Sequence, residues 1–137
     1  MDDLLKTLKI SSSGMRVQGA RLKVISENIA NADSLAQSPN GKPYRRKTIT
    51  FKNVLDRATG LDRVVVDKVR PDMSGFGKRY DPNHPSADAD GYVLTPNVNS
   101  LIEMTDMREA QRSYEANLEV IKASKAMLAG TIDILLR

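Results

Sequence analysis

Apolar residues recur every seven positions near both ends of the chain, and this repeat constrains the fold more than any other feature. Near the start, one heptad position is held by Leu8, Met15, Leu22 and Ile29, and Leu4 and Ile25 hold companion positions of the same stripe. Near the end, the corresponding residues are Met107, Tyr114, Ile121, Leu128 and Leu135, with Met104, Leu118 and Ile132 on the companion row. This period is typical of a helix that packs along one seam. The sequence therefore predicts two long terminal helices, at about residues 3–31 and 100–136.

The start of the second helix has a local signal. Ser100 and Glu103 have the spacing of a capping box, in which a hydroxyl accepts from a first-turn N–H and the Glu reaches back to the cap residue. Pro96 lies just upstream, where a helix is not expected to have begun. At about 1.5 Å per residue, this helix would reach roughly 50 Å.

The segment between the helices is polar and rich in turn residues. Strand-like runs occur at residues 48–51 and 63–69, and a third possible strand lies at residues 92–94. From Pro71 to Pro96 the density of Pro, Gly, Asp and Asn indicates an extended excursion with short hairpins. The predicted fold class is mainly α: two long terminal helices forming a coiled-coil layer, residues 1–33 and 100–137, around a small irregular β-containing centre, residues 34–99.

Long helices with a single apolar stripe need partners, because most helical stability comes from packing the amphipathic face. The two seams can pair with each other, which would leave small and apolar side chains on the outer flanks, where further helices could approach closely. These side chains are Val17, Val24, Ala110, Ala123, Ala126, Met127 and Ala129. The alternative is that the same residues complete an intramolecular bundle with the middle region.

Charge leaves a second class of function open. The net charge of +4 and pI of about 9.4 are compatible with a small basic nucleic-acid-binding helical protein. However, basic and acidic residues are mostly interleaved, and the only tight basic cluster is Arg45-Arg46-Lys47 beside Tyr44. Affinity that falls steeply with salt would identify a phosphate binder.

Catalytic, metal and cofactor sites are not expected. The chain has no cysteine, and its single histidine, His84, has no second imidazole to share a zinc ion. Asp88-Ala89-Asp90-Gly91 resembles the start of a calcium loop, but the twelfth position is Asn97 and not Glu, so a turn capped by Asp side chains is favoured. The glycine-rich run at residues 75–78 lacks the other residues of a phosphate-binding loop. We therefore predict a protein that is not an enzyme and carries no cofactor.

Motifs at both ends resemble those of flagellar basal-body rod proteins. Residues 12–15, Ser-Ser-Gly-Met, and residues 25–34, Ile-Ser-Glu-Asn-Ile-Ala-Asn-Ala-Asp-Ser, are similar to the N-terminal signature of rod and hook proteins, with Ser34 in place of the usual Thr. Asn97-Val98-Asn99, Glu103-Met104 and residues 110–117, Ala-Gln-Arg-Ser-Tyr-Glu-Ala-Asn, resemble the matching C-terminal signature. The stretch from Tyr80 to Val93 and the short length are most like the proximal rod members of that family.

This resemblance implies a structural subunit that polymerises through its terminal helices into the torque-transmitting drive shaft of the flagellum. The implied partners are copies of itself, other rod proteins, and the inner-membrane ring and export gate proteins; nucleic acid is not among them. The implied location is the periplasmic rod of the basal body, reached by flagellar type III export. The acidic start is not a cleavable signal, and no apolar run approaches the length of a membrane span.

The expected assembly interface combines the seam residues with polar residues near them. It comprises Leu8, Met15, Leu22, Ile25, Asn28, Ile29, Asn31, Met104, Met107, Gln111, Tyr114, Asn117, Leu118, Ile121, Leu128, Ile132 and Leu135. Within this set, buried Asn and Gln side chains could fix the axial register of neighbouring helices, as a buried Asn does in coiled coils. The other interpretation of the polar residues around Tyr114 is an intrahelical pair of Arg112 with Glu115. The sequence leaves both open.

Overall fold

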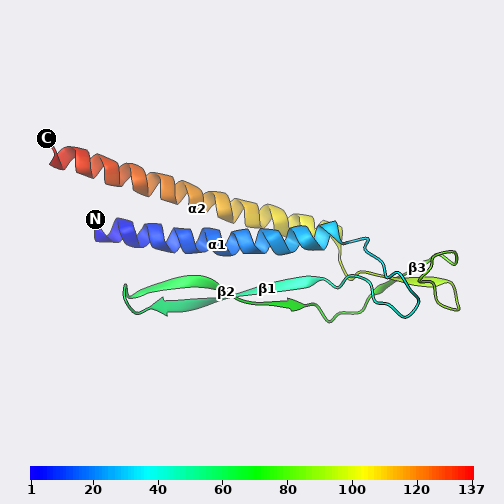
Figure 1. The fold of residues 1–137 in the computed structure, drawn as a ribbon. Coiled ribbons are helices and arrows are strands. Elements are labelled where there is room, and N and C mark those ends of the chain that lie inside the picture. The colour runs from blue at the N-terminus through cyan, green and yellow to red at the C-terminus, as the bar shows by residue number, and fades with distance from the viewer. The chain divides into compact units, whose positions relative to one another are not determined.

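A computed structural model describes every residue from Met1 to Arg137. Helix α1 spans Asp2–Ala30 and helix α2 spans Ser100–Leu135 (Figure 1). Four strands lie between them in the sequence: β1 (Lys47–Asp56), β2 (Leu61–Pro71), β3 (Gly77–Tyr80) and β4 (Tyr92–Thr95). The prediction of two terminal helices with a small β-containing centre is therefore confirmed. Neither helix has a stretch that is long and apolar enough to cross a bilayer.

The first turn of α1 carries its own stabilising charges. Asp2 and Asp3 lie at the positive end of the helix dipole, and Lys6 Nζ lies 2.6 Å from Asp2 Oδ2 one turn later. This hydrogen bond and the charge of Lys6 lower the pKa of Asp2. Both groups are solvent-exposed, so the pair contributes little to the stability of the folded chain.

The cap of α2 differs from the prediction. The side chain of Asn99, and not that of Ser100, accepts from the first-turn amides: Leu101 N lies 3.1 Å and Ile102 N 3.4 Å from Asn99 Oδ1. Glu103 does not close a capping box, because its carboxylate points inward to Arg46 and Asn28. The predicted helix start is right, and the predicted capping residues are wrong.

The first sheet is a two-stranded hairpin of β1 and β2. The connection at residues 57–60 is too short for a crossover, so the strands are antiparallel. Gly60 has a φ of 66° and donates its N–H to Asp56 O at 2.7 Å, which closes the turn. The predicted strands at residues 48–51 and 63–69 are confirmed, and both extend further than their β-branched residues indicated.

The second sheet pairs β3 with β4 in antiparallel register, with Gly77 opposite Thr95 and Tyr80 opposite Tyr92. The two tyrosine rings meet edge to face, with centroids 5.3 Å apart. Strand β4 matches the predicted third strand, whereas β3 was anticipated only as part of a short hairpin. Gly77-Lys78-Arg79-Tyr80 has no apolar alternation that would indicate a strand.

The chain divides into two compact units. Unit 1 comprises Met1–Leu22, Thr50–Lys68 and Arg108–Arg137, and unit 2 comprises Lys23–Ile49 and Val69–Met107. The buried residues of unit 1 are Ser11, Val17, Ala110 and Ser124. Those of unit 2 include Val24, Ile25, Val93, Asn28 and Glu103. Each interior is therefore small and partly polar.

This burial corrects the predicted position of three residues. Val17, Val24 and Ala110 were expected on the outer flanks and are buried instead. In unit 1 the helices approach closely on small side chains: a Cβ added to Gly14 would lie 2.9 Å from Asn117 Nδ2. Glu103, Ala110, Asn117 and Ser124 are seven residues apart, so a heptad row of small or polar residues forms the inner face of α2.

Candidate assembly surfaces and a buried polar cluster

A cluster of polar side chains occupies the interior of unit 2. Its members come from five separate parts of the chain, and we call them the polar cluster: Asn28, Tyr44, Arg46, Asp72, Asn97 and Glu103. Asn28 and Glu103 are each only 1% exposed. Buried groups of this kind are stable only when hydrogen-bonded or paired, so each side chain's partners determine what the cluster does.

Asn28 uses the whole hydrogen-bonding capacity of its amide. Its Oδ1 accepts from Lys47 N and from the Tyr44 hydroxyl, both at 2.9 Å. Its Nδ2 donates to Lys47 O at 2.9 Å and to Glu103 Oε2 at 3.3 Å. The side chain thus pairs with both backbone groups of Lys47, as a neighbouring strand would. This contact fixes the first residue of β1 against the end of α1.

Arg46 compensates the charge of the buried Glu103. Its Nε donates to Glu103 Oε1, and its Nη1 lies 3.3 Å from Asp72 Oδ2. Its Nη2 lies 3.9 Å from Asp106 Oδ2. Burial of Arg46 opposes its charge, but the hydrogen bonds and charges of Glu103 and Asp72 together outweigh this, and the pKa of Arg46 is raised. A buried carboxylate is tolerated here because a guanidinium neutralises it directly.

Asn97 ties the segment before α2 to both neighbouring strands. Its Oδ1 accepts from Arg46 N at 2.7 Å, and its Nδ2 donates to Asp72 O at 3.0 Å and to Ser74 Oγ at 2.9 Å. Asp72 N in turn donates to Arg46 O at 2.7 Å. The hydrogen bond from Ser74 N lowers the pKa of Asp72, with a smaller contribution from Arg46. The polar cluster therefore joins both helix ends to the base of the β1–β2 hairpin.

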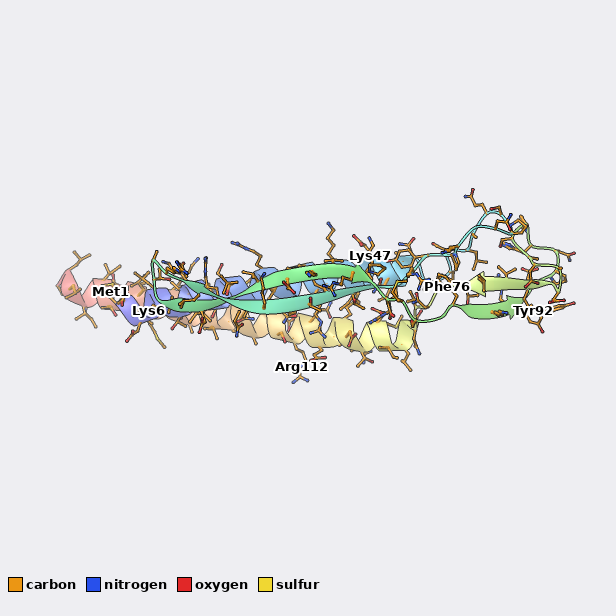
Figure 2. The ribbon with its side chains drawn as sticks, turned by 90° about the horizontal axis from the view of Figure 1, so that it is seen from below. Met1, Lys6, Lys47, Phe76, Tyr92 and Arg112 are labelled. Atoms are coloured by element: carbon orange, nitrogen blue, oxygen red, sulfur yellow. The ribbon has the colours of Figure 1, made fainter.

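The side chains of the basic cluster Arg45-Arg46-Lys47, which left nucleic-acid binding open, already have hydrogen-bond or ion-pair partners within unit 2. Arg45 donates to Asp72 O and Ser74 O and lies 4.2 Å from the centre of the Phe76 ring. Arg46 is held by the polar cluster. Lys47 Nζ pairs with Glu27 Oε2 at 3.0 Å (Lys47 and Phe76 are labelled in Figure 2). A phosphate would have to displace these partners, so the arrangement gives no support to a phosphate-binding patch.

The predicted interface residues fall into three classes of exposure. Ile25 and Asn28 are buried within the subunit. The half-buried members are Leu8, Met15, Leu22, Ile29, Asn31, Met107, Tyr114, Asn117, Leu118, Ile121 and Leu128. The exposed members are Met104, Gln111, Ile132 and Leu135. The amide of Asn31 is bonded to Glu27 O and to Ser34 Oγ, and that of Asn117 donates to Ser113 O. Arg112, one of the polar residues near Tyr114, projects away from α2 (Figure 2).

A second apolar row on α2 is exposed, and sequence reasoning did not identify it as a unit. We call it the outer stripe: Ala116, Val120, Ala123, Met127, Gly130 and Ile134, all of them exposed in unit 1. The exposed fractions of its three large side chains rise along the helix, from 41% at Val120 to 60% at Met127 and 76% at Ile134. The alternating spacing of four and three residues is that of a coiled-coil seam. The spacing is visible in the sequence and could have identified the outer stripe. It is hard to recognise as an apolar row because every second residue in it is Ala or Gly.

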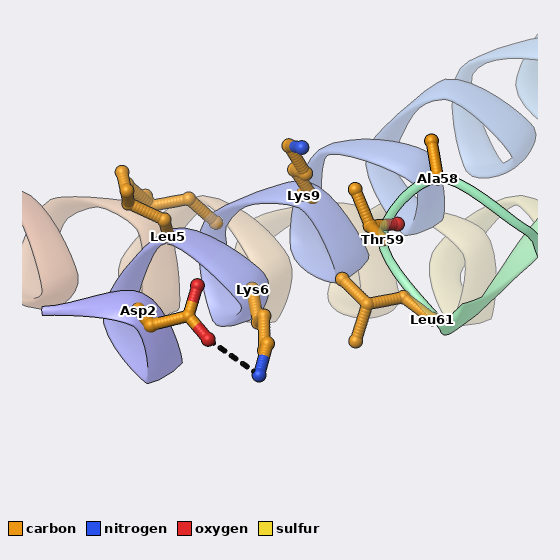
Figure 3. A pocket seen from close by; sticks show the side chains of 8 residues that line it. Asp2, Leu5, Lys6, Lys9, Ala58, Thr59 and Leu61 are labelled. Carbon is orange, nitrogen blue, oxygen red and sulfur yellow. Dashed lines mark ion pairs between the residues drawn. The ribbon is translucent and has the colours of Figure 1, made fainter.

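The surface of unit 1 also carries a hollow of about 490 Å³ between the start of α1 and the turn of the β1–β2 hairpin. Its lining includes Leu5, Lys9, Thr59 and Leu61, and the Asp2–Lys6 ion pair lies at its edge (Figure 3). These side chains do not form an acid–base pair or a nucleophile with a neighbouring base. The hollow therefore gives no indication of chemistry.

The turn residues considered as ligands have structural partners. Asp88 Oδ1 accepts from Asp90 N at 3.0 Å and from Tyr92 N at 2.9 Å, which confirms a turn capped by an Asp side chain. In the turn that comes just before Asp88, His84 Nδ1 lies 2.7 Å from Ser86 Oγ. No group of three or more His, Asp or Glu residues is arranged to hold a metal ion.

Comparison with known proteins matches both ends of the chain. The family model for flagella basal body rod proteins matches residues 8–34, and the model for the C-terminal part of flagellar basal body rod FlgEFG proteins matches residues 89–134. The polar cluster draws Asn28 from the first match, and Asn97 and Glu103 from the second. Arg46 and Asp72 come from the segment that neither model covers.

Full-length relatives give the same result. The flagellar basal-body rod protein FlgC of Agrobacterium fabrum is 53% identical over 98% of this chain and 97% of its own length. FlgC proteins of Borreliella burgdorferi and Salmonella typhimurium are each 39% identical over 96% of this chain and 97% of their own length. Together with the two terminal helices and the matched signatures, these similarities show that the chain belongs to the FlgC family of flagellar basal-body rod proteins and is a structural subunit of the rod.

Proposed function

We propose that the subunit joins the rod through its terminal helices, which form a coiled-coil layer with helices of neighbouring subunits. The observation that carries this proposal is the outer stripe of α2. A helix normally turns such a row toward a partner, and here the three large side chains remain accessible in the single chain. Covering each one fully would contribute roughly 1–2 kcal/mol, given what each still exposes.

Gly130 adds an independent argument. A glycine inside a helix costs about 1 kcal/mol relative to alanine, and a Cβ added to Gly130 would meet nothing within 4 Å in the chain itself. No packing within the subunit therefore accounts for this residue. A second helix that approaches closely along the stripe would account for it.

The remaining features of the proposal follow from family membership and from the sequence. The division into axial-core helices at residues 1–33 and 100–137 and a central segment at 34–99 assigns assembly to the ends. The partners would be copies of the subunit, other rod proteins, and the inner-membrane ring and export gate proteins. The subunit would reach the periplasmic rod by flagellar type III export without a cleaved signal, and its role there would be mechanical, with no catalysis.

The test places one charge on the outer stripe and the same charge off it. Met127→Asp puts a carboxylate where the proposed seam closes, whereas Ala129→Asp puts it on the opposite, exposed side of the same helix turn. Because Met127 is 60% exposed, the substitution should not disturb the isolated subunit. In cells that depend on this protein for swimming, we expect Met127→Asp to abolish motility and Ala129→Asp to preserve it.

The controls are the amount of exported protein and the circular dichroism of each purified variant. Equal swimming of both variants, at equal protein levels, would refute the assignment of the outer stripe to assembly. Loss of swimming in both would show that the two faces are equally required and that the stripe has no special role.

A further inference from the structure

Two surfaces of unit 1 lie outside the outer stripe and still leave apolar side chains uncovered. One is the hollow between the start of α1 and the turn of the β1–β2 hairpin, where Leu5 is 46% exposed. The other is the end of α2, residues 132–136, where Leu135 is 72% and Leu136 81% exposed. We propose that the end of α2 of one copy of the subunit docks into the hollow of the next copy. This inference rests on the proposed assembly through the terminal helices and assigns to it a second, separate contact.

The wall of the hollow is apolar. Leu5 and Leu8 contribute to it from α1, and Ala58 and Leu61 contribute from the hairpin. The side chain of Leu61 reaches from the hairpin toward α1 (Figure 3). A groove of this kind, between a helix and a neighbouring element, is the usual receptor for the apolar face of an amphipathic helix.

The rim of the hollow is basic. A second hollow, of about 340 Å³, continues the first along α1, since Leu8 and Lys9 line both. Together the two hollows are lined by four cations and two carboxylates: Lys6, Lys9, Arg16, Arg63, Asp2 and Asp56. Asp2 pairs with Lys6, and Asp56 pairs with Arg63. Lys9 and Arg16 therefore remain as the excess positive charge, which favours an acidic segment as the occupant.

The end of α2 has both of the required features. Asp133 and Leu136 are three residues apart, so they lie on one face of the last turn, and both are exposed. Ile134 of the outer stripe lies about 100–160° around the helix from them, given 3.6 residues per turn. Within one chain Leu135 and Leu136 remain uncovered, so the end of α2 does not fill its own hollow. In a second copy, Leu136 can meet the apolar wall while Asp133 meets Lys9.

The contact joins two different surfaces of the same unit, so it can repeat from copy to copy. A contact of this heterologous kind generates a ring or an open helical filament, whereas a surface that binds itself closes after two copies. A ring or a helix is the arrangement that a subunit of a rod requires. Because the contact exists only between copies, it is a feature of the assembled rod and not of the free subunit.

The first experiment uses the absence of cysteine from the chain. Leu61→Cys and Leu136→Cys are produced as separately tagged copies in the same swimming cells, which are then mildly oxidised. A disulfide needs Cβ atoms within about 4.5 Å, so the mixed dimer should be at least about tenfold more abundant than when Thr131→Cys replaces Leu136→Cys. Thr131 is likewise exposed, on the side of the last turns of α2 opposite to Asp133.

The second experiment reverses the charges that should meet. Lys9→Glu would bring a carboxylate against Asp133 of the next copy, so we expect it to abolish swimming. Adding Asp133→Lys to the same chain reverses both charges in every copy and should restore swimming. The control is Lys23→Glu: Lys23 is also exposed, lies further along the same face of α1 and lines neither hollow, so this variant should swim.

Three results would overturn the proposal. They are a mixed dimer no more abundant than the Thr131→Cys control, a disulfide within one chain instead of between chains when Leu61→Cys and Leu136→Cys are combined, and no rescue of Lys9→Glu by Asp133→Lys. The outer stripe is tested separately by Met127→Asp. If Met127→Asp swims and the mixed dimer forms, the stripe fails and the docked end of α2 stands. If Met127→Asp does not swim and the mixed dimer is absent, the stripe stands and the docked end of α2 fails.

Discussion

Replacing Asn28 by Asp tests the buried amide with the smallest possible change in shape. The carboxylate keeps the two acceptor contacts with Lys47 N and Tyr44 but loses both donated hydrogen bonds, to Lys47 O and to Glu103. Each acceptor left without a partner costs about 1–3 kcal/mol. The new charge would also lie about 3.3 Å from Glu103 Oε2, where two carboxylates repel by up to roughly 5 kcal/mol at an effective dielectric constant near 20.

These terms do not simply add, because the buried pair can take up a proton. The net loss of unfolding free energy at pH 7 should be about 3–5 kcal/mol. Asn31→Asp is the matched control: it is the same substitution one turn later, on a half-buried residue whose amide donates to Glu27 O. One lost hydrogen bond at a partly exposed site should cost about 1 kcal/mol.

The pH dependence supplies the second half of this test. Burial and the charge of Glu103 would raise the pKa of a carboxyl group at position 28, so its destabilising effect is complete above that pKa and is relieved as the pH falls through it. Urea unfolding at pH 7 and pH 5 should therefore show the gap between Asn28→Asp and the natural chain narrowing, while the gap for Asn31→Asp stays constant. Equal costs for the two substitutions, or a gap that widens in acid, would refute the assignment of Asn28 to a buried polar cluster.

Two further predictions concern the hairpins and the acid limit of unit 2. Gly91→Ala should lower the free energy of unfolding in urea by about 2–3 kcal/mol, because φ is 83° and the new Cβ would lie 3.0 Å from Tyr80 Cε2 and 3.1 Å from Pro82 Cβ. Gly60→Ala, at a φ of 66° and with no atom within 4 Å of the new Cβ, should cost only about 1 kcal/mol. A larger cost for Gly60→Ala than for Gly91→Ala would contradict this geometry. The pKa of Asp72 is lowered by the hydrogen bond from Ser74 N, so its stabilisation is present above the unfolded-state value near 4 and is lost as pH falls through the folded-state value. In Asp72→Asn, urea midpoints measured from pH 5 to pH 3 should fall less steeply than in the natural chain; identical slopes would remove Asp72 from the acid response.

The sequence predicted the parts of this fold that depend on local pattern. Both helices, the strand-like runs around Ile49 and Val66, and the Asp88 turn follow from periodicity, β-branching and turn chemistry within a few residues. The cap of α2 shows the limit of local reasoning. Asn99 and Ser100 are both good capping residues, and the outcome depends on Glu103, whose carboxylate is drawn inward by an Arg 57 positions away. No local rule contains that information.

The same limit explains what was missed at the candidate site. Arg45-Arg46-Lys47 reads as a basic cluster in sequence, and its partners Glu27, Asp72 and Glu103 come from other segments. The inner face of α2 was missed for a different reason. The predicted seam followed the largest apolar residues, whereas in unit 1 Gly14 lies so near Asn117 that an added Cβ would be 2.9 Å from its Nδ2. The face by which one helix packs closely on another can be made of small residues or of large ones. A pattern of apolar residues alone does not show which of the two faces of a helix points inward.

The distribution of residue types on α2 bears directly on how a rod subunit avoids premature assembly. In a self-sufficient helical hairpin the large apolar residues face inward and the small or polar ones face outward. Here Ala110 and Ser124 are buried, while Val120, Met127 and Ile134 are exposed. Under the proposed role of the outer stripe, the far half of α2 would cover these large apolar side chains only when a neighbouring subunit packs against them. If the stripe mediates assembly as proposed, the free energy of ordering this half would become available at the growing end of a filament, where several neighbours are held in place together.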